Sequence, residues 1–119
     1  MTSCATSTPS EIADAIRDSD VVFTAGALGV ELLSADAREQ CSSLKVAIDL
    51  NAIPPLGIGG IEVTDKAVER DGTICYGAIG VGGTKMKIHK AAVRKLFDAN
   101  DQVFDAEEIF AIGRELLAR

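Results

Sequence analysis

The stretch Lys45-Val-Ala-Ile-Asp-Leu-Asn-Ala-Ile-Pro-Pro-Leu-Gly-Ile-Gly-Gly60 decides the predicted fold of this chain. Its first six residues are an apolar run that predicts a buried strand, and the rest is a glycine-rich loop. The same arrangement recurs where the run Thr73–Tyr76 is followed by the glycine-rich segment Gly77–Lys85. Glycine tolerates close backbone approach, and the ligands of open α/β sheets bind at the carboxyl ends of the strands. The two loops therefore predict a site for a flat or phosphorylated ligand at one edge of a sheet.

Apolar periodicity and capping residues predict the other elements. Predicted strands cover residues 20–24, 45–50 and 73–76, and a short edge segment covers 61–63. Helices are predicted over residues 7–16, 34–40 and 105–117. A further short helix is predicted from Val30, and a long one that begins at Val81 or Thr84 and ends at about Ala99. This alternation predicts an α/β fold with a parallel sheet. Three strands are too few for a complete doubly wound sheet, so the pattern indicates part of a Rossmann-type fold.

The two C-terminal helices carry apolar residues at helical spacing. Asp105 followed by Glu108 predicts a capping box at the start of the last helix. The expected apolar stripe of the first helix is Met86, Val93, Leu96 and Phe97, and the last helix is expected to bury Ile109, Ile112, Leu116 and Leu117.

Composition limits the class of protein. A chain of 119 residues suffices for one hydrophobic core, and a net charge of −6 argues against nucleic-acid binding as the main role. Three cysteines without a CxxC spacing suit a reducing cytoplasm, and with one histidine they predict no metal site. Residues 1–10 lack the pattern of a secretory signal. The chain has no apolar run long enough to span a membrane, so we expect a cytoplasmic protein without membrane contact.

The segment Gly77–Lys85 superficially resembles a phosphate-binding loop, but Thr84 precedes Lys85, which is the wrong order for that motif. Two interpretations remain. The segment is a glycine turn whose free N–H groups at a helix start hold a ligand, or it is a tight strand-to-helix turn without one. Lys85 and His89 share a helix face, and cations near a helix start oppose the helix dipole. Lys85 is therefore the best candidate to face a ligand, the alternative being a solvated basic face.

The ends of the first two strands offer further candidates. The Asn51 amide is expected either to bond a ligand carboxamide or to cap its own turn. The small residues from Thr24 to Ala27 fit a ring lying over the backbone, or a packed turn. No nucleophile–base pair or paired carboxylate has a useful spacing. This absence fits hydride transfer, in which the cofactor supplies the chemistry and the protein orients it.

Three long motifs resemble the NAD(P)-dependent methylene-tetrahydromethanopterin/methylene-tetrahydrofolate dehydrogenases of methylotrophic bacteria. They are DVVFTAGALGVELL at 20–33, DLNAIPPLGIGG at 49–60 and YGAIGVGGTKMKIH at 76–89. The ending, residues 100–117, fits as well, so the likeness covers nearly the whole chain from about Ser10. Members of this family resemble a two-domain enzyme more than twice as long. The resemblance implies that residues 1–103 are the second half of a Rossmann-type nucleotide-binding domain and that 104–119 are a C-terminal helix. The chain would then be a fragment or the product of an internal start.

The resemblance also implies an activity and a site. The full enzyme would pass hydride from a reduced pterin C1 carrier, tetrahydromethanopterin or tetrahydrofolate, to NAD or NADP, and would form a homo-oligomer. The implied cofactor-binding residues are Thr24, Ala25 and Gly26 at one strand end and Asn51, Ala52 and Ile53 near the nicotinamide, with Lys85 as the catalytic residue. The alternative is a catalytically inactive Rossmann module that acts only in association or nucleotide binding.

Overall fold

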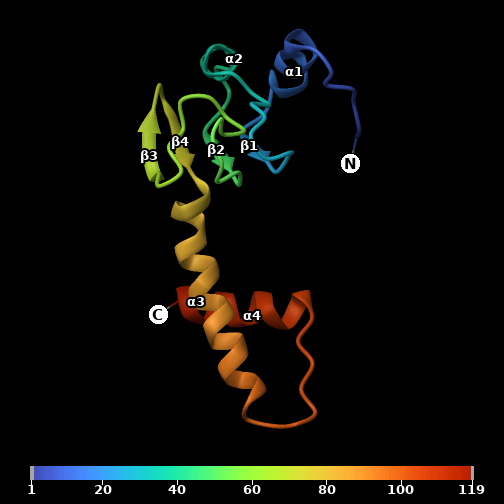
Figure 1. The fold of residues 1–119 in the computed structure, drawn as a ribbon, viewed down its shortest axis with the longest axis vertical. Coiled ribbons are helices and arrows are strands. Elements are labelled where there is room, and N and C mark those ends of the chain that lie inside the picture. The colour runs from blue at the N-terminus through green and yellow to red at the C-terminus, as the bar shows by residue number, and fades with distance from the viewer. Residues whose placement is uncertain (1, 119) are drawn as a thin grey trace. The chain divides into compact units, whose positions relative to one another are not determined.

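The computed structural model describes residues 2–118, which form two compact units divided between Val81 and Gly82. Unit 1 contains a four-stranded sheet with two short helices, and unit 2 is helical (Figure 1). The elements of unit 1 are α1 Pro9–Ile16, β1 Val21–Thr24, α2 Ala35–Gln40, β2 Val46–Asp49, β3 Lys66–Arg70 and β4 Thr73–Tyr76. Helix α3 spans Ala78–Leu96 and helix α4 spans Ala106–Leu117.

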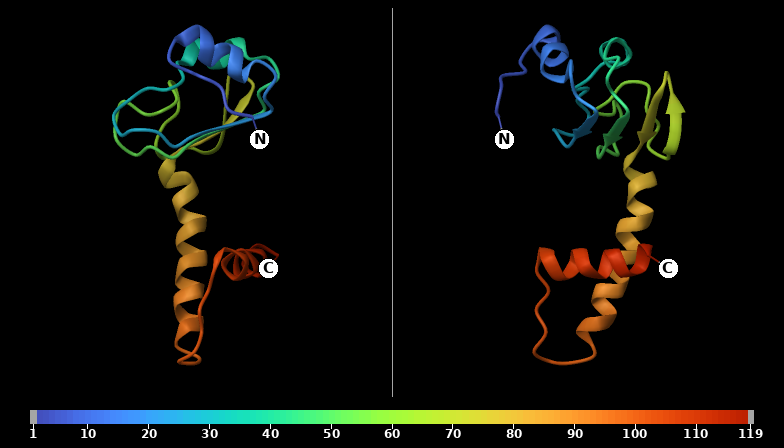
Figure 2. Two further views of the ribbon diagram at one scale, coloured as in Figure 1. Left: turned by 90° about the vertical axis from the view of Figure 1, so that its right-hand side faces the viewer. Right: turned by 180° about the vertical axis from the view of Figure 1, so that it is seen from behind.

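The sheet has the strand order β1-β2-β4-β3 (Figure 1). Strands β1, β2 and β4 are parallel, with Val21 opposite Val46 and Val46 opposite Ile74, and β3 pairs antiparallel with β4. Helices α1 and α2 lie close together in both views of Figure 2. This mostly parallel sheet confirms the predicted α/β class and is consistent with part of a Rossmann-type domain.

Strand β3 is the element that the sequence analysis missed. The expected edge segment at 61–63 is not a strand, and the edge is formed instead by Lys66–Arg70. A two-residue turn follows β3, and both of its residues, Asp71 (φ 51°) and Gly72 (φ 77°), have positive φ. Asp-Gly is a strong signal for a hairpin turn of this kind. The turn therefore explains why so polar a segment pairs with β4.

The short helices begin at side-chain caps. Thr8 and Glu11 form a capping box at the start of α1, and the Ser34 hydroxyl accepts a hydrogen bond from the Ala37 N–H at the start of α2. Both helices were predicted, but the predicted helix from Val30 is wrong. There the N–H groups of Leu32 and Leu33 both donate to the Gly57 carbonyl, which holds this segment beside the 51–60 loop.

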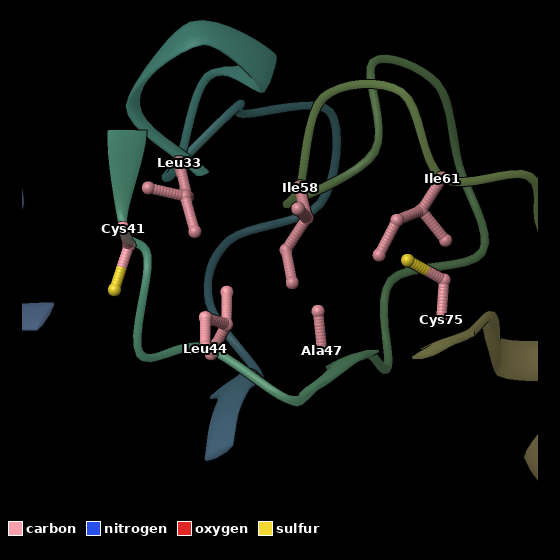
Figure 3. Close-up of a cluster of buried hydrophobic side chains, with 7 residues drawn as sticks. All are labelled: Leu33, Cys41, Leu44, Ala47, Ile58, Ile61 and Cys75. Atoms are coloured by element: carbon pink, nitrogen blue, oxygen red, sulfur yellow. The ribbon is translucent and has the colours of Figure 1, made fainter. Parts of the chain in front are cut away.

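The core of unit 1 is aliphatic and lies between the sheet and the segments that cover it. Figure 3 shows Leu33 and Ile58 pointing toward Leu44 and Ala47. Ala47, Ile58 and Cys75 are fully buried. The Ile58 side chain anchors the far end of the glycine-rich loop, so the core fixes the loop's position.

The start of α3 corrects the interpretation of the second glycine-rich loop. The helix begins at Ala78 rather than at 81 or 84, so Gly80, Gly82 and Gly83 are helical. A Cβ on Gly80 would overlap the Asp65 carbonyl oxygen, whereas one on Gly82 or Gly83 would meet no atom within 4 Å. Most of the segment is therefore the first part of a helix, which packs on the Asp65 backbone at Gly80, rather than a loop.

Unit 2 buries little apolar surface. The predicted capping box of Asp105 and Glu108 is present. Ile112 is buried, and Gly113 is close enough to Ile88 that a Cβ there would lie 3.0 Å from the Ile88 Cδ1. The expected burial in α4 is wrong for Ile109 and Leu117, which are 41% and 69% exposed. The apolar stripe of α3, formed by Met86, Val93, Leu96 and Phe97, is likewise between 39% and 86% exposed. Two helices alone offer too few neighbours to cover both stripes.

Candidate functional site

The carboxyl ends of β1 and β2 place two polar side chains side by side. Thr24 and Asp49 are the last residues of their strands and face each other across the parallel ladder. The Thr24 Oγ1 donates a hydrogen bond of 2.9 Å to the Asp49 Oδ1, and both residues are buried. The position matches the edge at which open α/β sheets bind their ligands.

Asp49 is the centre of this cluster. Its side chain is fully buried and accepts two further hydrogen bonds, from the Asn51 backbone N to Oδ1 (2.9 Å) and from the Ile58 N to Oδ2 (2.8 Å). A buried carboxylate is tolerated only when its oxygens are bonded in this way. The single carboxylate thereby joins the end of β1, the start of the 51–60 loop and the far end of that loop.

Asn51 carries an unsatisfied donor. Its side chain is 3% exposed, and its Nδ2 has no hydrogen-bond partner among the described residues. Gly57 packs against the same group, because a Cβ on Gly57 would lie 2.9 Å from the Asn51 Nδ2 and 2.9 Å from the Thr24 Oγ1. Buried donors are nearly always paired in folded proteins. An orphaned amide beside a glycine suits a carbonyl or carboxamide acceptor of a bound ligand.

The remaining predicted cofactor residues flank this cluster. Ala25, Gly26 and Ala52 are exposed, and Ile53 is 50% exposed. Thr24 and Ala25 also line a mostly apolar cavity of about 220 Å³ together with side chains of α1 and Leu32. The structure thus brings Thr24 and Asn51 together through Asp49 and leaves the other predicted residues on the loops beside them.

Lys85 lies in unit 2, where its side chain is exposed on α3. The helix begins seven residues earlier, at Ala78. The helix dipole acts mainly on the first turn, so Lys85 does not stand at an unfavourable helix start, contrary to the prediction. The prediction for Lys85 therefore depends on the family resemblance alone.

A comparison with the known protein families finds no match. Two curated proteins of Methylorubrum extorquens (strain AM1) are similar to this chain. The chain is 46% identical to the bifunctional protein MdtA over 116 residues, which are 98% of this chain and 40% of that protein. It is 34% identical to an NAD(P)-dependent methylenetetrahydromethanopterin dehydrogenase over 105 residues, which are 86% of this chain and 35% of that protein. The chain is a homologue of these proteins.

This relation confirms the predicted resemblance to NAD(P)-dependent methylenetetrahydromethanopterin dehydrogenases. The chain spans well under half of the length of each relative. The match to MdtA includes nearly every residue of this chain, so the strand-end cluster and unit 2 both lie within the shared part.

Asp49 is the residue of this dehydrogenase homologue that the sequence analysis did not single out. Its signal is a carboxylate at the end of an otherwise apolar strand, directly before the glycine-rich loop. Such a charge is rarely buried unless it is paired or hydrogen-bonded. Its partner Thr24 is 25 residues away, so spacing alone could not reveal the pairing.

A second buried carboxylate, Asp65, has a structural partner. The Arg70 guanidinium donates hydrogen bonds of 2.7 and 2.8 Å to its two oxygens and holds the pKa of the Asp65 carboxyl below its usual value, although burial opposes the shift. Among the described residues, no group of three or more His, Cys, Asp or Glu could hold a metal ion. Within that part of the chain, no helix is long and apolar enough to cross a membrane.

Proposed function

We propose that this chain forms part of an oxidoreductase that transfers hydride from the methylene group of methylene-tetrahydromethanopterin or methylene-tetrahydrofolate to NAD(P)+ in one-carbon metabolism. The observation that carries the proposal is the orphaned, buried Asn51 amide at the carboxyl end of β2. The chain is also homologous to a dehydrogenase whose name specifies NAD(P) and methylenetetrahydromethanopterin, and this homology supports hydride transfer between a pterin and a nicotinamide. In the whole enzyme, which we expect to be a homo-oligomer, other segments complete the pterin cleft.

The proposed roles follow from the chemistry of the side chains. The Asn51 amide donates to a carboxamide oxygen, because its Nδ2 has no hydrogen-bond partner among residues 2–118. The small residues after β1 leave the backbone accessible to a flat ring. Thr24, Ala25 and Gly26 lie against the cofactor, Asn51, Ala52 and Ile53 lie near the nicotinamide, and the Lys85 ammonium orients the pterin. When bound, NAD or NADP supplies the hydride acceptor.

A chimera tests this proposal. In it, the residues of the methylenetetrahydromethanopterin dehydrogenase that match this chain are replaced by the 105 matched residues of this chain. We expect the chimera to reduce NAD(P)+ with either methylene pterin, as measured by the absorbance of NAD(P)H. A folded chimera that binds nucleotide yet reduces none would contradict the proposal.

The role of Lys85 is tested in the same chimera. We expect Lys85→Ala to lower kcat/KM by about tenfold or more, which is a loss of about 1.4 kcal/mol of transition-state stabilisation. Lys87→Ala is the matched control, because Lys87 is exposed on the same helix but points to a different face. Equal effects of the two substitutions would remove Lys85 from the site.

A second candidate function is a catalytically inactive module that acts in association or nucleotide binding. This candidate is favoured by the edge strand β1, whose residues Val21 and Phe23 are 46% and 64% exposed. Parallel sheets normally have both faces covered, and an open strand edge favours pairing with another chain. Light scattering of the purified chain tests this candidate, because a stable monomer at all concentrations would exclude association.

A further inference from the structure

The cluster at the carboxyl ends of β1 and β2 is organised by a carboxylate that does not itself face solvent. Asp49 is fully buried, and its two oxygens accept hydrogen bonds from the Thr24 hydroxyl, the Asn51 backbone N and the Ile58 backbone N. All three donors belong to segments that surround the Gly57 position. The carboxylate therefore fixes where these segments lie relative to one another.

We propose that Asp49 is the positioning residue of the nucleotide site, holding the Thr24 hydroxyl and the Asn51 amide in their binding geometry before the cofactor arrives. This inference rests on the proposed nicotinamide site. It adds a residue that touches no ligand and acts through its neighbours. Preorganisation of this kind raises affinity because less conformational freedom is lost on binding.

The chemistry of the cluster requires an acceptor at position 49. Three N–H or O–H donors converge on the side chain, and a carboxylate offers acceptors only. In Asp49→Asn, one of the two oxygens becomes an NH₂ group that faces a donor. Either the Ile58 N–H or the pair formed by the Thr24 hydroxyl and the Asn51 N–H then loses its acceptor.

The other orphaned buried donor in the described residues shows why the Asn51 amide is distinctive. The Arg38 Nε also lacks a partner, but the same guanidinium donates to the Arg70 carbonyl (3.0 Å) and to the Asp71 carboxylate (2.8 Å). Arg38 thus has a complete structural role in holding the β3–β4 turn. Within the part of the chain that the structure describes, the Asn51 Nδ2 makes no hydrogen bond that would explain its burial, so this amide is the group that Asp49 keeps ready.

The experiment is an NMR titration of the complete 119-residue chain with NADP⁺ and, separately, with NAD⁺. The readout is the side-chain NH₂ signal of Asn51, assigned through an Asn51→Gln variant. In the wild type we expect this signal to move at roughly millimolar nucleotide. In Asp49→Asn we expect the apparent Kd to rise about tenfold, equal to 1.4 kcal/mol.

Asp65→Asn is the matched control for Asp49→Asn. Asp65 is also a buried carboxylate that accepts a backbone N–H, from Glu62, but its side-chain partner is Arg70. The Asp65→Asn variant therefore reports the effect of lost stability while the hydrogen bonds around Asp49 stay intact. We expect its Kd for the nucleotide to match that of the wild type. Equal weakening in both variants, or an unchanged Kd in Asp49→Asn, would overturn the positioning role.

A measurement on the wild type keeps the inference testable if Asp49→Asn does not fold. The backbone amides of Asn51 and Ile58 donate to Asp49, so both should exchange with solvent much more slowly than the amide of exposed Ala52. Rapid exchange at Asn51 would overturn the inference without any variant. Absence of a nucleotide-induced shift in the wild type would also overturn it. The dehydrogenase proposal is judged separately, by NAD(P)H formation in the chimera.

Discussion

Alanine substitutions at neighbouring glycines near the start of α3 should change the stability of the chain in opposite directions. In Gly80→Ala, the new Cβ would overlap the Asp65 carbonyl oxygen and lie 2.7 Å from the Asp65 carbonyl carbon, both of them backbone atoms that cannot rotate away. Overpacking of this kind costs about 1–3 kcal/mol or more, and the gain in helix propensity of about 1 kcal/mol offsets only part of it. In Gly82→Ala the new Cβ meets no described atom within 4 Å beyond its chain neighbours and the adjoining helix backbone, so only the gain of about 1 kcal/mol remains.

Urea unfolding followed by far-UV circular dichroism measures this contrast. We expect Gly80→Ala to unfold at lower urea than the wild type and Gly82→Ala to unfold at higher urea or to raise the helical signal. Gly83→Ala should behave like Gly82→Ala, and Gly77→Ala like Gly80→Ala, because a Cβ on Gly77 would lie 2.5 Å from the Val63 carbonyl oxygen. Equal stability of Gly80→Ala and Gly82→Ala would refute the packing described for α3.

Two other predictions concern ionisable side chains. The Arg70 hydrogen bond lowers the pKa of Asp65 from its usual 3.8, so its contribution to stability is present above about pH 4 and is lost as pH falls through the lowered value. Urea unfolding between neutral and acid pH should therefore show a steeper loss of stability for the wild type than for Asp65→Asn. Burial raises the pKa of the Cys75 thiol, Cys41 is also buried and Cys4 is exposed. A thiol reagent should thus modify Cys4 rapidly in the native chain and all three cysteines only in denaturant, and rapid native modification of Cys75 would contradict its burial.

The elements that could be predicted from the sequence are those set by local signals. The caps at Ser34 and Asp105 and the apolar run of β2 depend on residues within a few positions of each other. The start of α3 could not be predicted, because the contact that explains Gly80 is a tertiary one. Gly80 packs against the Asp65 backbone, 15 residues earlier in the sequence, and that proximity has no local signature. A glycine-rich run therefore looked like a loop when it is the first part of a helix.

In the candidate site, too, some features follow from local sequence and others depend on tertiary neighbours. The position of Asn51 at the end of a buried strand follows from the pattern of the sequence, and its burial is now explained by the loop that returns at Gly57. The role of Asp49 depends on a partner in another strand, which becomes a neighbour only through the parallel register. Whether these residues bind a nicotinamide cofactor stays a prediction.

The strongest test of the site is a substitution that should not destabilise the chain. Because the Asn51 Nδ2 has no partner among the described residues, its burial costs free energy that an apolar side chain of the same branched shape would recover. Leaving a buried donor unpaired costs about 1–3 kcal/mol, so Asn51→Leu should unfold at the same or a higher urea concentration than the wild type. Arg38→Met is the contrasting variant, because it removes two hydrogen bonds and should lower stability. If Asn51→Leu stabilises the fold but abolishes the nucleotide-induced shifts of the neighbouring backbone amides, such as that of Ala52, then Asn51 is retained for binding. A clear loss of stability in Asn51→Leu would instead assign the amide a structural role, and the argument for a ligand at this edge would fail.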